Sequence, residues 1–199
     1  MTRFKTLSMV ACAFLVAAAS GGSRVAAADK AVLRLRAFAV NMTGGGPRAP
    51  RAGSLDIVIE RWSTDEERDR LRGLLIEKGS DALLKALQDI KPRVGYIRSS
   101  RSLGWDIQFA REQPIGDGRR VTIATDRPMS FWELRAQPRS VDYDFTLAEI
   151  HLTKDGKGEG KLATQAKISW NPETRTVEIE NYGIEPVRLT EVHVEGGKK

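Results

Sequence analysis

Residues 145–170 read FTLAEIHLTKDGKGEGKLATQAKISW, and this stretch decides the fold. Strand-like patterns occupy 143–153 and 161–170, and the glycine-rich turn at 155–158 separates them. In the first pattern apolar and polar side chains alternate, which places the apolar ones on one face of a strand. The stretch therefore predicts an antiparallel hairpin with one face on a core and the other toward water or a partner layer.

Further strand patterns extend from this hairpin in both directions. They lie at 32–42, 55–60, 94–97, 105–109, 121–125, 176–181 and 187–194. Short strands at regular spacing, joined by turn residues, are typical of all-β barrels and sandwiches. We therefore expect a mainly β (α+β) fold, an antiparallel meander of about nine strands forming a barrel or sandwich.

A helix pair at about 64–91 interrupts the meander between its second and third strands. Ser63 followed by Glu66 has the spacing of a capping box, and Gly79 is placed to end the first helix. Ser80 can cap the second helix, and Pro92 stops it. Each helix carries its own apolar stripe. The stripes consist of Leu71, Leu74 and Leu75 in the first helix and of Leu83, Leu87 and Ile90 in the second.

The N-terminus has the order of a secretory signal peptide. A basic opening precedes the apolar run 7–19, which is shorter than the roughly 20 residues that span a bilayer. Small residues then continue to Ala28, and cleavage after Ala28 fits better than cleavage after Ala19. We expect a signal peptide at 1–28, a single β-rich domain at 29–199, no transmembrane anchor after cleavage, and a periplasmic or secreted bacterial protein.

Cleavage changes the reactive inventory of the chain. The formal charge falls from +6 to +3, because three basic residues and no acid leave with the signal. The lone cysteine, Cys12, leaves as well, so the mature chain is cysteine-free. This excludes disulfides, cysteine-based zinc sites and cysteine nucleophiles. An exported protein with a weak positive charge is not expected to bind nucleic acid.

The two histidines lie in similar segments near the C-terminus. LAEIHL at 147–152 resembles LTEVHV at 189–194, and each holds a Glu and a His two residues apart. Residues two apart share a face of a strand. If the two strands were neighbours, Glu149, His151, Glu191 and His193 could hold zinc, iron or manganese. The simpler interpretation places all four on a solvated face.

Arginine is concentrated in the middle of the chain, with nine arginines and five acids in residues 93–139. Arginine together with aromatic residues can bind anionic ligands or polymers. The candidate binding residues are Trp105, Arg127, Trp132, Arg135 and Arg139. A solvated arginine-rich face is the plainer explanation.

Four segments carry a resemblance to known sequences. They are 59–68 (IERWSTDEER), 93–98 (RVGYIR), 124–128 (ATDRP) and 130–133 (SFWE). These segments resemble parts of uncharacterised exported bacterial proteins, over most of the mature chain. The resemblance implies export and brings no activity, ligand or catalytic residue.

The sequence leads to one main functional expectation and one alternative. We expect an exported non-enzymatic β-domain that binds a small apolar or anionic ligand, or a component of the cell envelope, with no cofactor and no catalytic residue. The alternative is an exported metal-dependent enzyme that uses the two Glu/His pairs with zinc, iron or manganese.

Overall fold

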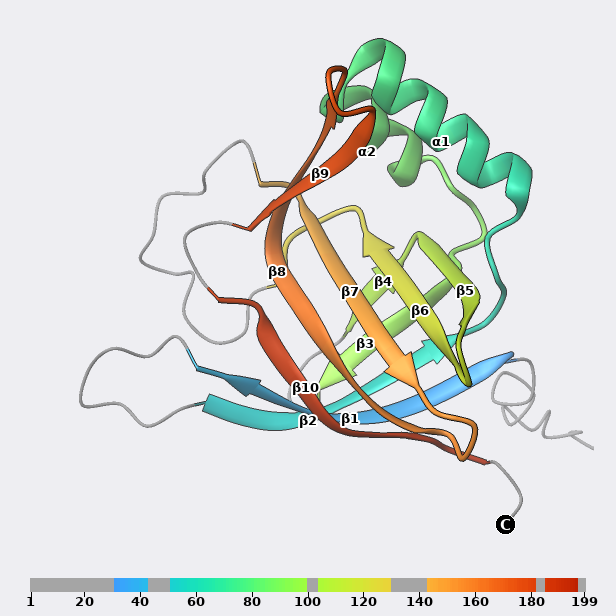
Figure 1. The fold of residues 1–199 in the computed structure, drawn as a ribbon, viewed down its shortest axis with the longest axis vertical. Coiled ribbons are helices and arrows are strands. Elements are labelled where there is room, and N and C mark those ends of the chain that lie inside the picture. Colours follow the sequence, from blue (N-terminus) through green and yellow to red (C-terminus); the bar gives the residue numbers. More distant parts are fainter. Residues whose placement is uncertain (1–30, 43–50, 100–103, 130–142, 182–184, 197–199) are drawn as a thin grey trace, which may run out of the picture.

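All described strands of the chain belong to one antiparallel sheet (Figure 1). The computed structural model describes residues 31–42, 51–99, 104–129, 143–181 and 185–196. The expected signal peptide therefore lies outside the described residues. The elements are β1 (Leu33–Asn41), β2 (Arg51–Ile59), α1 (Asp65–Lys78), α2 (Ser80–Gln88), β3 (Gly95–Ser99), β4 (Trp105–Ile107), β5 (Phe109–Ile115), β6 (Gly118–Thr125), β7 (Phe145–Leu152), β8 (Lys157–Asn171), β9 (Thr176–Asn181) and β10 (Val187–Val194).

The sheet curls into a nearly closed barrel, which resolves the choice between barrel and sandwich. Its strand order is β4-β3-β2-β1-β10-β8-β7-β6-β5. The two ends of this order, β4 and β5, are consecutive in the chain and are separated only by Gln108. The N–H of Gln108 donates to the carbonyl of Ala124 on β6 at 3.0 Å. Counting β4 and β5 as one bent strand and leaving β9 aside, eight strands enclose the core.

The prediction of about nine antiparallel strands is confirmed as to class and differs in detail. The described residues form ten strands, because residues 109–115 form β5 beyond the predicted strand at 105–109. Pro114 weakens the strand pattern in the sequence, because proline has no N–H to donate to a sheet. The structure nevertheless accommodates it in β5, opposite Arg119 of β6. The insertion of two helices between the second and third strands is confirmed.

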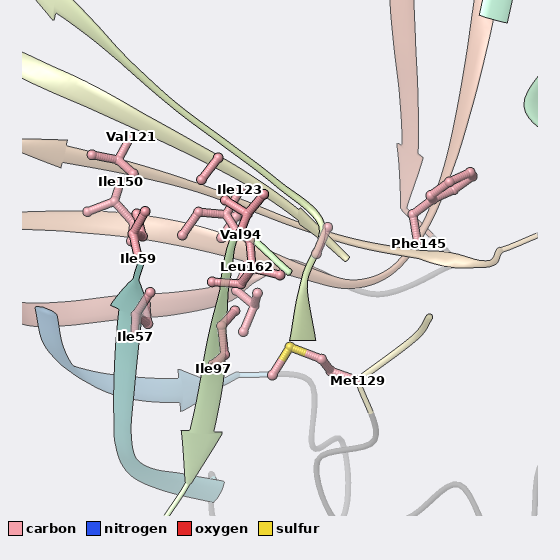
Figure 2. Close-up of a cluster of buried hydrophobic side chains, with 14 of the residues drawn as sticks. Ile57, Ile59, Val94, Ile97, Val121, Ile123, Met129, Phe145, Ile150 and Leu162 are labelled. Atoms are coloured by element: carbon pink, nitrogen blue, oxygen red, sulfur yellow. The ribbon is translucent and has the colours of Figure 1, made fainter. Parts of the chain in front are cut away.

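The interior of the barrel is filled by apolar side chains from every side of it (Figure 2). Leu35, Ile57, Ile107, Ile123 and Leu162 come from five different strands, and each is 1% exposed or less. An eight-stranded barrel is just wide enough for side chains to fill it. The alternating pattern that predicted the strands therefore also predicts which side chains form the core.

The helix pair lies against one side of the barrel. Both helices contact β8, and Asp65 at the start of α1 accepts a hydrogen bond from Arg111 of β5 at 2.7 Å. The buried side chains of the pair are Leu71, Leu75, Leu83, Ala86 and Leu87. These residues join the same hydrophobic core as the barrel. The apolar stripe predicted from the sequence is thus the packed face, with Leu74 only partly buried.

The capping box exists one residue later than predicted. Thr64 caps α1: its hydroxyl accepts from the N–H of Glu67 at 3.1 Å, and the Glu67 carboxylate accepts from the N–H of Thr64 at 3.0 Å. Ser63 is buried and its hydroxyl accepts instead from the N–H of Ala110 on β5 at 3.1 Å. Gly79 ends α1 as predicted and is also the N-cap of α2, so Ser80 is the first helical residue and not a cap. In the described part of the chain, neither helix is long and apolar enough to cross a membrane.

Candidate functional site

Two of the five predicted ligand-binding residues lie in the described structure, and both contribute to the fold. Trp105, on β4, is partly buried and packs against the core. Arg127 follows β6, and its guanidinium donates to the carbonyl of Gly104 at 3.2 Å. Its own carbonyl accepts from the hydroxyl of Thr125 at 2.6 Å. Trp132, Arg135 and Arg139 lie outside the described residues.

The described part of the arginine-rich segment is largely compensated by acids. The ion pairs are Arg93 with Glu60 and Asp106, Arg98 with Asp56, Arg111 with Asp65, Arg119 with Glu112, and Arg120 with Glu149. Each pair cancels the local charge that an anionic ligand would use. These arginines therefore form a mixed-charge surface and not a strongly positive one.

The two Glu/His pairs are on β7 and β10, and β8 lies between these strands. His151 is opposite Glu159 of β8, whereas His193 is opposite Lys157 of β8. The residue of β8 that is opposite His193 is thus a cation, whose ammonium group lies 3.7 Å from the carboxylate of Asp155. Among the described residues, no group of three or more His, Cys, Asp or Glu is placed to hold a metal ion. The structure does not bring Glu149, His151, Glu191 and His193 together as one site.

Each pair keeps its own local contacts. Nε2 of His151 lies 2.8 Å from Oε1 of Glu149, and Arg120 is 3.5 Å from the same carboxylate. The hydrogen bond with His151 is the largest cause that lowers the pKa of Glu149, and the charge of Arg120 acts in the same direction. Nδ1 of His193 instead lies 3.0 Å from the carbonyl of Glu191, its own neighbour on β10. About half of the Glu149 and His151 side chains is exposed, so this dyad is a solvated surface pair.

Removing the imidazole should change the titration of Glu149. In His151→Ala, we expect the pKa of Glu149 to rise toward its ordinary value of 4.5, because its main hydrogen-bond donor is lost. Carboxyl chemical shifts followed by NMR against pH measure this directly. The matched control is His193→Ala, which should leave Glu149 unchanged.

The lowered pKa of Glu149 also determines how this residue changes the stability of the fold with pH. The pKa of Glu149 is lower in the folded than in the unfolded chain, so its contribution is complete above about pH 4.5 and is lost as the pH falls through the folded pKa. An equal Glu149 titration in the two histidine variants would contradict the assignment.

Two open clefts meet at the end of the barrel near the β5–β6 hairpin. One has a volume of about 710 Å³ and reaches Trp62 and Asp65, and the other, of about 780 Å³, reaches His151 and Lys157. Gly118 and Arg119 line both clefts. Most of the charged lining is internally paired: Arg111 with Asp65, Arg119 with Glu112, Lys154 with Asp117, and Lys157 with Asp155. The clefts are therefore polar but close to neutral, and nothing in them selects a ligand charge.

A third surface is the edge of the sheet at β9. Among the described strands it pairs with β8 alone, and it lies off the path of the nearly closed barrel. Figure 1 shows β9 (orange-red) at the margin of the barrel, next to its partner β8. Two of its side chains, Val177 and Ile179, are apolar and exposed, by 46% and 60%. An open strand edge with exposed apolar residues is a template for pairing with another chain.

Sequence reasoning predicted the strand at 176–181 and missed its place in the sheet. Regular alternation of Val177, Glu178, Ile179 and Glu180 indicates a strand and does not show which strands flank it. The position is decided by β10, which returns to pair with both β1 and β8. The one available signal was that these apolar residues alternate with acids only, which is unusual for a strand enclosed on both sides.

No known protein family, curated protein or solved structure matches the chain. The resemblance to exported bacterial proteins thus stays a prediction, and the function of the chain has to be inferred from its own residues.

Proposed function

We propose that this chain is an exported, non-enzymatic β-domain of the bacterial periplasm or exterior that binds a component of the cell envelope. The observation that carries the proposal is β9, whose outer edge no strand of the described residues occupies and which presents two exposed apolar side chains. Burying such residues against a partner is favourable by about 25 cal/mol per Å² of apolar surface. The proposed partner surface is this edge of the sheet, beyond the packed interior of the barrel.

The filled core supports binding on the surface and not in the interior. Buried apolar side chains from β1, β2, β4, β6, β7 and β8 occupy the space that a small apolar ligand would need. A core packed in this way has few voids larger than a water molecule. A small ligand inside the barrel would have to displace these side chains. A component of the cell envelope, bound at the surface, is therefore better supported than a small ligand bound in the interior.

Export is supported by the sequence pattern at 1–28 and by the cysteine-free chain that follows it. The test is to express the full chain in a bacterial host, separate the cell fractions and measure the mass of the purified protein. We expect a periplasmic or secreted product whose first residue is Asp29. A full-length product that stays in the cytoplasm would overturn the export proposal.

Binding at β9 is tested by site-specific crosslinking in intact cells. A photo-reactive amino acid at Val177 should give one discrete adduct, because the side chain is exposed at the proposed interface. The matched control is the same amino acid at Ile76 on α1, which is exposed to a similar degree, 41% against 46%. Adducts at both positions, or at neither, would overturn the proposed surface.

A further inference from the structure

We propose that the envelope partner adds a β-strand at residues 177–180 of β9, along the edge that no described strand occupies, and that this strand alternates apolar residues with lysine or arginine. The inference rests on the proposed function and names the chemistry of the partner. In strand addition, main-chain hydrogen bonds supply affinity and alternate side chains supply specificity. β9 has features that serve each of these roles.

The apolar face of β9 continues a surface that begins on β8. Val177 is opposite Trp170 and Ile179 is opposite Ile168 in the register of the two strands. Ile168 is buried and Trp170 is partly buried against the core, whereas both residues of β9 are exposed. The apolar residues on this face are thus shielded from water on β8 and exposed on β9. One further strand with apolar residues on this face would extend it.

The other face of β9 carries two carboxylates, those of Glu178 and Glu180. Glu178 accepts a hydrogen bond from Asn171 at 2.6 Å, and Glu180 accepts one from the hydroxyl of Tyr143 at 2.7 Å. Both donors are neutral and leave the charge of the carboxylates in place. In the register, Lys167 of β8 is opposite Glu180 and offsets part of its charge, whereas Glu178 is opposite the neutral Ser169. Within the described residues, neither carboxylate forms an ion pair. Two fixed negative charges at an open edge favour a partner strand with basic residues on that face.

A second copy of β9 fits this edge poorly. In an antiparallel pair, residues directly opposite each other point to the same face of the sheet. Both registers that place Ile179 opposite an apolar residue of the second copy also place Glu178 opposite a glutamate, and the register that pairs Val177 with itself leaves Ile179 opposite Arg175. Like charges directly opposite each other are destabilising. Self-association through β9 is therefore disfavoured, and a different, basic strand is favoured.

Two designed peptides serve as probes for the missing strand. One alternates lysine with valine and isoleucine, KVKIKV, and the other replaces each lysine by glutamate, EVEIEV. With the exported mature chain, we expect the basic peptide to bind about tenfold more tightly in fluorescence anisotropy at low salt, because each charge pair changes from unlike to like. Amide hydrogen exchange of 176–181 should slow when this peptide binds.

A charge swap tests whether the preference comes from β9. In the double variant Glu178→Lys/Glu180→Lys, the preference should reverse toward the acidic peptide. The control variant, Glu77→Lys/Asp89→Lys, changes net charge equally at exposed positions near the ends of α1 and α2, and should keep the wild-type preference.

Three results would overturn the inference. These are an unchanged preference in the β9 variant, exchange protection located elsewhere in the chain, and the absence of binding by either peptide at millimolar concentration. Crosslinking at Val177 separates this inference from the proposed function. If Val177 gives a discrete adduct but neither peptide binds, the proposed binding surface stands. Only the inference that the partner is a basic strand is then rejected.

Discussion

Replacing Ile150 with alanine is expected to lower the free energy of unfolding by about 2–5 kcal/mol. Ile150 lies at the middle of β7 and its side chain is 0% exposed. Figure 2 shows it beside Val121 and Ile59, which come from β6 and β2. The side chain thus joins strands that are distant in the sequence, and its removal leaves a cavity between them.

The neighbours of Ile150 have little capacity to fill that cavity. On β8 its register partner is Gly160, which has no side chain to move into the space. The partner on β6, Val121, is β-branched and stiff at χ1. The cost should therefore include the full cavity contribution in addition to the lost transfer free energy.

Urea unfolding followed by circular dichroism measures the effect of the Ile150 substitution. Each kcal/mol should also lower Tm by about 2–4 °C in a chain of this size. The control is His151→Ala on the same strand, where the exposed side chain faces away from the core and the change should stay within about 0.5 kcal/mol. Similar losses in the two variants would show that Ile150 does not lie in the core.

Much of this barrel could be predicted because its strands alternate so regularly. Residues 145–170 specify two strands and the turn between them, and the inward residues of that pattern are the buried ones. Leu71, Leu75, Leu83 and Leu87 likewise predicted both the helices and their packed faces. In each case the spacing of apolar residues predicts the element and its buried face, because side chains on one face of a strand or helix recur with the period of that element.

The errors occur where a contact between distant residues decides the structure. Ser63 and Thr64 are adjacent and either could begin a helix, yet only Thr64 caps α1, because Ser63 is bound by Ala110, 47 positions away along the chain. β5 was missed because its pattern is weak and its pairing with β6 forms it. No local window contains either contact.

The candidate site shows the same division. The Glu-x-His repeats correctly place each pair on one strand, but whether the strands touch depends on sheet order, which puts β8 between them. The position of β9 at an edge of the described sheet is equally a property of sheet order, because β10 pairs with β8 and β1. The proposed function therefore depends on which strands are neighbours, and strand patterns alone do not determine that.

Replacing Gly158 with valine is expected to destabilise the chain by about 3 kcal/mol or more, near or above the upper end of the usual cost of overpacking. A Cβ at Gly158 would lie 1.9 Å from the carbonyl oxygen of His151 and 3.1 Å from the Cα of Leu152. Both atoms belong to the backbone of β7, so no side-chain rotation can relieve the clash. The β7–β8 ladder would have to separate at this point.

The effect runs against local propensity, which makes the measurement decisive. Valine favours strands more than glycine does, so propensity alone predicts that Gly158→Val stabilises β8. Close approach predicts the opposite, because β8 is held between β7 and β10: Gly158 is paired with Leu152 on one side and Val192 on the other. A strand enclosed on both sides cannot move away from one neighbour without losing the other. Urea unfolding together with amide exchange of β7 and β8 distinguishes the two outcomes.

The matched control is Gly73→Ala on α1. A Cβ at Gly73 would meet nothing within 4 Å, and alanine favours helix by about 1 kcal/mol over glycine. This variant should be as stable as the wild type or more stable, while Gly158→Val loses stability and exchange protection in β8 first. If Gly158→Val unfolded at the wild-type urea concentration, the close contact between β7 and β8 would be refuted. β8 also carries β9, so a variant that loosens β8 should weaken the binding of the basic peptide as well.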